Sequence, residues 1–214
     1  MSLLSLISPS SDEIAPHEHL NLGIMASGNG SNFEAIAQAI EKKILNASVK
    51  LVVYNNSDAK VQERAKNWGI KSLLLDHRHY SSREELDQAI VETFRVHHVD
   101  WIVMAGWMRI VTKVLLNSYP NRVINIHPSL LPSFKGLHAV DKALAAKIKI
   151  TGCSVHLASL EVDSGPIIMQ AAVPILAGDT AESLHTRIQI QEHNILPAAI
   201  ALASSLYSQS SSRE

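Results

Sequence analysis

The sequence is poor in cysteine and has no excess of charge of one sign. Its single cysteine, Cys153, excludes a disulfide framework within the chain and a zinc site built on several thiolates. Lysine and arginine together number 19 and aspartate and glutamate 20, so the net charge of −1 provides no global basic field for nucleic acid. No apolar run approaches the ~20 residues that a membrane-spanning helix needs. These absences predict a cytoplasmic protein that binds neither nucleic acid nor a membrane.

The residues that are present suit one well-packed domain. Hydrophobic residues make up 46% and charged residues 18% of a 214-residue chain, which is typical of globular proteins. The sequence up to Pro16 contains no lysine or arginine, so we expect residues 1–19 to form a disordered extension rather than a secretory signal. The serine-rich residues 204–214 are expected to form a flexible tail, which leaves residues 20–203 as the folded domain.

The chain is organised around Asn-Ile-His-Pro-Ser-Leu-Leu-Pro at residues 125–132. The apolar pair before it predicts the end of a buried strand, and Pro128 ends that strand because it lacks an N–H donor. Asn125 and His127 are two positions apart, so they face the same side of an extended chain. Ligands of open α/β sheets bind beyond the carboxyl ends of the strands. We therefore expect this pair to face a ligand, although a turn-capping Asn and a core His are the simpler alternative.

A glycine-rich turn follows the first predicted strand. Residues 26–32 read Ala-Ser-Gly-Asn-Gly-Ser-Asn and lead into an apolar helical pattern. Glycines let the backbone approach a ligand closely, and the free N–H groups and dipole of a helix N-terminus favour a phosphate. Ser31 and Asn32 are suited to capping the helix. The turn indicates a phosphate site, and a plain tight turn stays open as the alternative.

A dinucleotide cofactor is a competing interpretation of the same turn. The fingerprint Gly-x-Gly-x-x-Gly requires a third glycine where Phe33 stands. It also requires an acidic residue at the end of the second strand, where the chain has Asn55 and Asn56. Both departures argue against a nicotinamide enzyme and favour a single phosphate monoester.

Strands and helices alternate along the chain. This order predicts an α/β fold, a Rossmann-like, mostly parallel twisted sheet with helices on both faces and right-handed crossovers. The Asn125/His127 pair then lies at the end of the fifth strand. A long last helix opens at Asp179, and Pro197 is expected to kink or divide it. The strands are expected at residues 20–25, 49–54, 71–75, 100–104, 123–127, 151–157 and 167–175.

Other polar residues are candidates that need the fold to bring them to the site. Residues 105–110 can present backbone groups to a flat heterocycle. Asp163 lies in a turn and could orient an imidazole, and Gln189 and Glu192 share one helical face that could hold a sugar diol. Core packing is the alternative for Trp107 and Met108, a solvated turn for Asp163, and a solvated helix face for Gln189 and Glu192. The eleven histidines are scattered without a metal-ligand pattern, so no metal is predicted.

Five stretches occur in order along the chain: Ser-Gly-Asn-Gly-Ser-Asn (27–32), Ala-Gly-Trp-Met-Arg-Ile (105–110), Asn-Ile-His-Pro-Ser-Leu-Leu-Pro (125–132), Gly-Leu-His (136–138) and Asp-Ser-Gly-Pro-Ile (163–167). Together they resemble the phosphoribosylglycinamide formyltransferase family, folate-dependent enzymes of purine synthesis. The resemblance runs from about residue 21 to 203. Ser164 stands where the family often has a second glycine, and Trp107 where a Phe is common.

The resemblance implies a reaction and roles for residues. The formyl group of 10-formyltetrahydrofolate, the co-substrate, would pass to the amine of glycinamide ribonucleotide without a metal. An amide and a protonated imidazole would stabilise the tetrahedral oxyanion, and a carboxylate would hold the imidazole. The implied catalytic residues are Asn125, His127 and Asp163. The implied phosphate and ribose residues are Gly30, Ser31, Asn32, Gln189 and Glu192. The implied folate residues are Arg83, Met108, Arg109, Ile110, Val111 and Asn125.

Rival functions stay open on the sequence alone. A formyltetrahydrofolate hydrolase would share the trio, and a non-catalytic folate- or nucleotide-binding module would bind without turnover. The hydrolase and the related methionyl-tRNA formyltransferase carry an extra domain for which we expect this chain to have no room. The sequence does not decide between a monomer and a homodimer.

Overall fold

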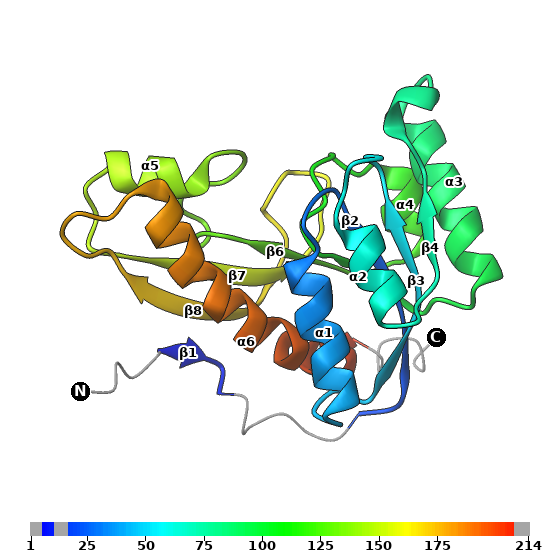
Figure 1. Cartoon of the computed structure of the whole chain (residues 1–214), viewed down its shortest axis with the longest axis horizontal. Coiled ribbons are helices and arrows are strands. Elements are labelled where there is room, and N and C mark those ends of the chain that lie inside the picture. Colours follow the sequence, from blue (N-terminus) through cyan, green and yellow to red (C-terminus); the bar gives the residue numbers. More distant parts are fainter. Residues whose placement is uncertain (1–5, 11–16, 208–214) are drawn as a thin grey trace.

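The computed structural model describes residues 6–10 and 17–207, and within them the chain forms one α/β domain (Figure 1). The sheet in this part of the chain has eight strands, in the order β1-β8-β7-β6-β5-β2-β3-β4. The strands are β1 (Ile7–Ser8), β2 (Leu20–Ala26), β3 (Ala47–Tyr54), β4 (Ser72–Leu74), β5 (Trp101–Met104), β6 (Val123–His127), β7 (Ile150–Leu157) and β8 (Ile167–Pro174). The helices are α1 (Ser31–Glu41), α2 (Val61–Asn67), α3 (Arg83–Val96), α4 (Lys113–Ser118), α5 (Ala139–Ala145) and α6 (Ala181–Tyr207), with a short 3-10 helix at His77–His79. The predicted fold class is confirmed.

The order of the strands creates a switch point beside the glycine-rich turn. The chain runs from β2 outward to β3 and β4, and then returns with β5 and β6 to the other side of β2. These five strands are parallel, so the loops after β2 and β5 lie side by side at their carboxyl ends. The Ser27 N–H donates to the Gly106 carbonyl at 3.0 Å, and the Met108 N–H donates to Ser27 Oγ at 2.8 Å. A crevice at such a point is where ligands bind in this class of fold.

The other strands of the sheet are paired antiparallel. β7 is antiparallel to β6, β8 is antiparallel to β7, and the short β1 pairs with the outer edge of β8. Because a loop rather than a crossover helix joins β7 to β8, residues 158–166 are free to fold back over the sheet. The segment that carries Asp163 is this loop.

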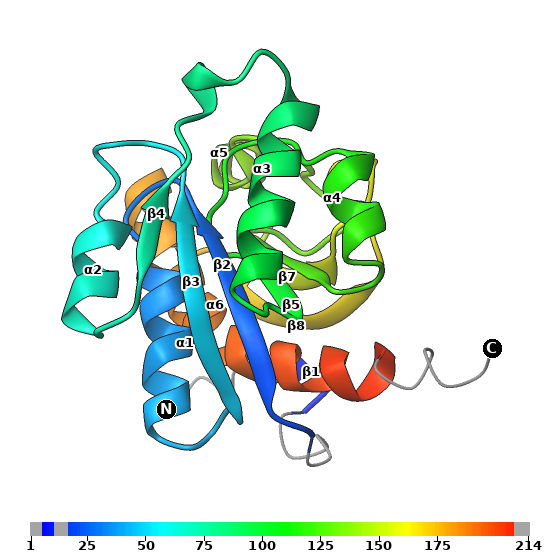
Figure 2. The same cartoon turned by 90° about the vertical axis from the view of Figure 1, so that its right-hand side faces the viewer.

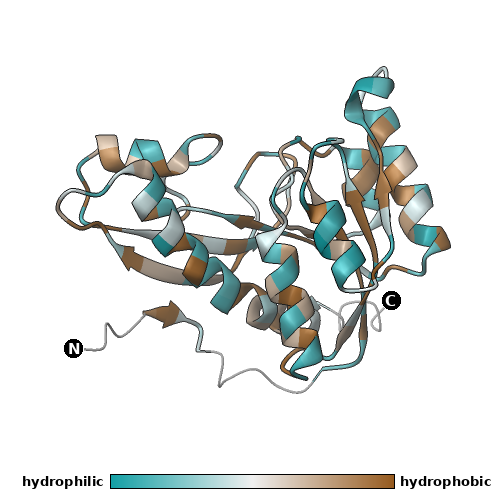
Figure 3. Cartoon of the chain, viewed as in Figure 1, coloured by the Kyte–Doolittle hydropathy of each residue, from teal (hydrophilic) through white to brown (hydrophobic). Residues whose placement is uncertain are grey.

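Apolar side chains alternate along the strands and make a core on each face of the sheet. Leu22 and Ile24 of β2 pack with α1 and α6, and Met25 packs with α3 and α4 on the other face. Figure 2 shows α1 and α3 on opposite sides of the strands, and Figure 3 shows the hydrophobic colouring of those strands. A Cβ on Gly23 would lie 2.7 Å from the ring of Phe94, so this glycine lets α3 pack closely on the sheet.

Three sequence predictions are corrected by the structure. Helix α1 begins after Gly30, whose φ is 75° and which has no side chain to cap it, so Ser31 and Asn32 do not cap the helix. Helix α6 extends beyond Ser204 to Tyr207, past the expected start of the tail, and Pro197 does not divide it. The expected extension contributes the paired strand β1, whereas residues 1–5, 11–16 and 208–214 lie outside the described residues.

Candidate active site

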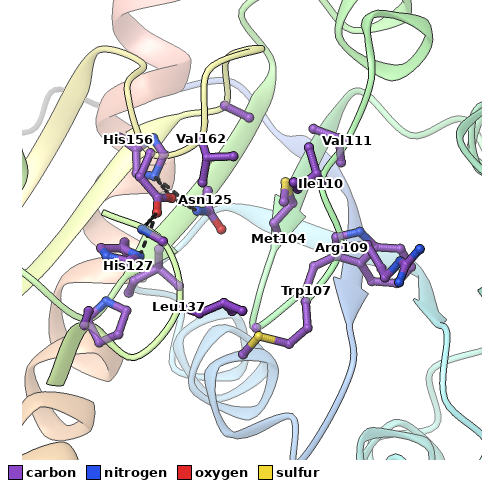
Figure 4. Close-up of a pocket in the computed structure, with 18 of the residues that line it drawn as sticks. Met104, Trp107, Arg109, Ile110, Val111, Asn125, His127, Leu137, His156 and Val162 are labelled. Carbon is purple, nitrogen blue, oxygen red and sulfur yellow. Dashed lines mark hydrogen bonds and ion pairs between the residues drawn. The ribbon is translucent and has the colours of Figure 1, made fainter. Parts of the chain in front are cut away.

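Three predicted residues converge at the end of β6. The Asp163 carboxylate lies 3.2 Å from Nδ1 of His127 and accepts a hydrogen bond from the Asn125 amide at 3.4 Å (Figure 4). Asn125 and His127 are held by strand pairing, and Asp163 reaches them from the loop between β7 and β8. The side chains of His127 and Asp163 are each only 8% exposed. A carboxylate, an imidazole and an amide thus share one largely buried place.

Each ring nitrogen of His127 faces a hydrogen-bond acceptor. Its Nε2 lies 2.9 Å from the Phe134 carbonyl oxygen, which can only accept, so Nε2 carries a hydrogen. Its Nδ1 faces the Asp163 carboxylate, which is also an acceptor. Two acceptors, one on each ring nitrogen, match an imidazolium that donates on both sides. The geometry therefore favours a charged His127 paired with an ionised Asp163.

The protonation of Asp163 agrees with this pairing. Burial raises the pKa of the carboxyl, but contact with His156, the Gly136 N–H at 2.8 Å and the charges of both histidines lower it more. The pKa of Asp163 is consequently below its usual value, and the group is ionised at neutral pH.

A fourth member, His156, was missed by the sequence reasoning. It lies directly opposite Asn125 across the β6–β7 pair. Its Nε2 is 3.1 Å from the Asn125 amide nitrogen and 3.6 Å from Asp163, and its Nδ1 lies 2.8 Å from the Leu157 carbonyl. The one available signal was a buried-strand pattern interrupted by histidine, because the antiparallel register that brings it to Asn125 is not visible in the sequence.

A cavity of about 730 Å³ opens beside these residues, within the size range of small-molecule sites. The residues that the resemblance assigns to folate all line it: Arg83, Met108, Arg109, Ile110, Val111 and Asn125. Trp107, Leu137 and Val162 add apolar wall (Figure 4). The cavity lies at the switch point and has the catalytic candidates at one end, so a flat ligand bound in it would approach them.

The phosphate and ribose candidates form a second group at the start of α1. Gln189 donates to Ser31 Oγ at 2.9 Å, and Asn32 donates to a carboxylate oxygen of Glu192 at 3.0 Å. Burial raises the pKa of Glu192, whose side chain lies between α1 and α6. These residues are not among those lining the cavity, but Ser27 connects their turn to its wall. The first-turn N–H groups of α1 are left without a side-chain cap, as an anion site requires.

The described residues contain no group of three or more histidine, cysteine, aspartate or glutamate side chains placed to hold a metal ion. Among the same residues, no helix has the length and apolar character needed to cross a membrane.

Comparison with known proteins gives the class. A family model described as formyl transferase matches residues 20–200, and the chain belongs to this family. Phosphoribosylglycinamide formyltransferase of Bacillus subtilis (strain 168) is 42% identical over 177 residues, which are 83% of this chain and 91% of that protein. The crystal structure of glycinamide ribonucleotide transformylase 1 from Symbiobacterium toebii has a TM-score of 0.86 and 42% identity, and the match covers 87% of this chain and 88% of that one. The resemblance found in the sequence is thereby confirmed.

Some relatives are much longer. The trifunctional purine biosynthetic protein adenosine-3 of Gallus gallus is 39% identical over 186 residues, which are 87% of this chain but 18% of that protein. The chain therefore corresponds to one part of that protein and to nearly the whole length of the bacterial relative.

Proposed function

We propose that this chain is a phosphoribosylglycinamide formyltransferase, which transfers the formyl group of 10-formyltetrahydrofolate to the amine of glycinamide ribonucleotide in purine synthesis. The observation that carries the proposal is the meeting of Asn125, His127 and Asp163 at one end of a folate-sized cavity. The uncapped start of α1 nearby supports a phosphorylated second substrate.

The amine of the ribonucleotide attacks the formyl carbon and forms a new N–C bond. The carbonyl oxygen becomes an oxyanion, and the bond from the folate nitrogen breaks as a proton moves from the attacking to the leaving nitrogen. Both N–H groups of His127 already meet acceptors in this structure, so we assign it the stabilising positive charge. The Asn125 amide nitrogen lies 3.1 Å from His156 Nε2 and makes a longer contact of 3.4 Å with Asp163, so we assign to the oxyanion the N–H group that points toward Asp163.

Asp163 then has two tasks. Its ionised carboxylate keeps His127 charged, and it is a base that could pass the proton through a water molecule. Acid–base assistance of this kind contributes roughly 10²–10⁴ in rate. Holding both substrates at adjoining sites contributes the orientation term.

The binding residues divide between the two substrates. We assign the phosphate to the N–H groups of Gly30, Ser31 and Asn32, and the ribose to Gln189 and Glu192. The pterin and its tail are assigned to the cavity residues Arg83 and 108–111. The folate assignments are supported by the lining of the cavity, and the ribose assignments by the bonds of Gln189 and Glu192 to Ser31 and Asn32.

A single-turnover assay tests the function. Purified protein is mixed with 10-formyltetrahydrofolate, with and without glycinamide ribonucleotide, and formylated ribonucleotide and free formate are both measured. Formylated ribonucleotide made only when both substrates are present supports the proposal. Free formate released without ribonucleotide would identify a hydrolase, and binding without turnover would identify a non-catalytic module.

We place the enzyme in the cytoplasm. The support is Cys153, a buried free thiol whose pKa is raised chiefly by burial, so it is an inert part of the core rather than half of a disulfide. A homodimer stays a prediction, which light scattering of the purified protein tests against the mass of one chain.

A further inference from the structure

We propose that Lys135 is a positioning residue for formyl transfer, because its side chain ties the loop of residues 128–138 to the loop that carries Asp163. The inference rests on the proposed function. Nζ of Lys135 donates to Ser164 Oγ at 2.5 Å and to a carboxylate oxygen of Glu161 at 3.2 Å. Both acceptors belong to the loop of residues 158–166, so one side chain spans two loops that are far apart in sequence.

The neighbours of Lys135 in the chain make the contacts that fix the catalytic candidates. The Phe134 carbonyl accepts from His127 Nε2 at 2.9 Å, and the Gly136 N–H donates to Asp163 at 2.8 Å. Three consecutive residues therefore make the three contacts: Phe134 with the imidazole of His127, Lys135 with the loop of residues 158–166, and Gly136 with the carboxylate of Asp163. A shift of one loop relative to the other would change the distance between His127 and Asp163.

The loop that carries Asp163 has few other anchors. Within the described residues, the hydrogen bonds and ion pairs that connect residues 159–164 to the rest of the chain end on Lys135 or on the neighbours of Asp163. The remaining side-chain bonds of the loop, from Ser159 and Ser164, stay inside it. Without Lys135, the carboxylate itself would have to hold the loop in place.

The backbone conformation makes an anchor more important. Asp163 has φ of 51° and Phe134 has φ of 55°, in the left-handed region that non-glycine residues rarely adopt. Such conformations persist only where the surroundings over-determine them. The Glu161 side chain is 78% exposed, so its ion pair with Lys135 contributes little. The hydrogen bond from Lys135 to the half-buried Ser164 is therefore the main link between the two loops. Ser164 stands where the family often has a glycine, which has no side chain to accept this bond.

The experiment compares Lys135→Met, Ser164→Ala and the double variant in the formyl transfer assay. A displaced reacting group loses rate steeply, so we expect Lys135→Met to lower kcat about tenfold. Both KM values should stay within about twofold, because the substrate contacts are untouched. The acid limb of the kcat profile should move to higher pH, since a loosened Asp163 loses the contacts that lower its pKa. The double variant should be no worse than the poorer single variant.

Controls separate this role from a structural one. Lys135→Arg should recover most of kcat, and Lys149→Met, which removes an exposed lysine without a side-chain bond, should match the wild type. Inactive wild-type protein would refute the proposed function itself. With active wild type, an unchanged kcat and acid limb in Lys135→Met would refute the positioning role, even if the melting temperature falls. Additive losses in the double variant would refute the link through Ser164, and Ser164→Ala keeps the test intact if Lys135→Met does not fold.

Discussion

Replacing Asp163 with asparagine changes the charge of the site while keeping its shape. In the wild type, the Gly136 N–H donates to the Asp163 carboxylate at 2.8 Å. The amide oxygen of the asparagine can accept the same hydrogen bond and can stay beside His127. The amide is neutral, however, so the imidazolium loses the partner that holds its second proton. The variant should fold, because asparagine has nearly the same size and shape as aspartate and leaves no cavity, but the loss of one partner of a buried ion pair should lower its melting temperature.

The size of the effect follows from the distance. Unit charges 3.2 Å apart attract by about 5 kcal/mol at an effective dielectric constant of about 20, which is an upper bound before solvation is counted. The loss of acid–base assistance is roughly 10²–10⁴ in rate, or about 3–5 kcal/mol. The two estimates agree, so we expect Asp163→Asn to lower kcat by about 10²–10⁴ and to change both KM values little.

The assay follows formylated ribonucleotide under saturating concentrations of both substrates, and thermal melting checks the fold. Glu41→Gln is the matched control, since it replaces an exposed carboxylate at the end of α1, remote from the three candidates in sequence and assigned no role here. A folded Asp163→Asn enzyme with kcat within about threefold of the wild type would show that the carboxylate takes no part in the chemistry, and the charge argument would be wrong.

Further substitutions test the binding assignments. Gly30 has a φ of 75°, and a Cβ on it would lie 2.6 Å from Val61, so Gly30→Val should raise the ribonucleotide KM at least about tenfold and lower the melting temperature. A rise in the folate KM alone would show that the phosphate is assigned to the wrong residues. Burial raises the pKa of Glu192, so folded stability falls as pH rises from the unfolded pKa toward the folded one. Glu192→Gln should therefore gain melting temperature over the wild type at pH 8 but not at pH 4, and bind ribonucleotide less tightly. Arg83→Ala should raise folate KM about fivefold at low salt and less at high salt.

Local sequence signals predicted seven of the eight described strands and the placing of Asn125 and His127 at one strand end. Apolar runs placed β6, and the spacing of Asn125 and His127 placed both on one strand end, because the two-residue period of a strand is a local property. Ser82 caps α3 by accepting from the Glu85 N–H at 3.1 Å, the contact that a serine three positions before a glutamate favours at the start of a helix. The match of a local pattern to a local structure explains why these inferences were correct.

The failures concern contacts between distant segments. Ser31 and Asn32 fit the pattern of caps, but their side chains instead bond to Gln189 and Glu192 of α6, more than 150 positions away in the chain. His156 reaches the site through the antiparallel register of β7 with β6, which the polar pattern of one strand cannot reveal. The position of Asp163 could be inferred only by resemblance, because a turn carboxylate has no periodicity that points to a partner.

The reversal of strand direction after β6 gives the site one rigid side and one adjustable side. Asn125 and His156 lie on strands that are paired on both sides, and His127 is paired with Ser154 of β7, so strand pairing limits the movement of all three. Asp163 lies on a loop that β7 can send back across the sheet only because β7 runs antiparallel to β6. The distance between the carboxylate and His127 therefore depends on contacts between loops rather than on the pairing of the sheet. Substitutions that alter these loops should change turnover and its pH dependence before they change the stability of the fold.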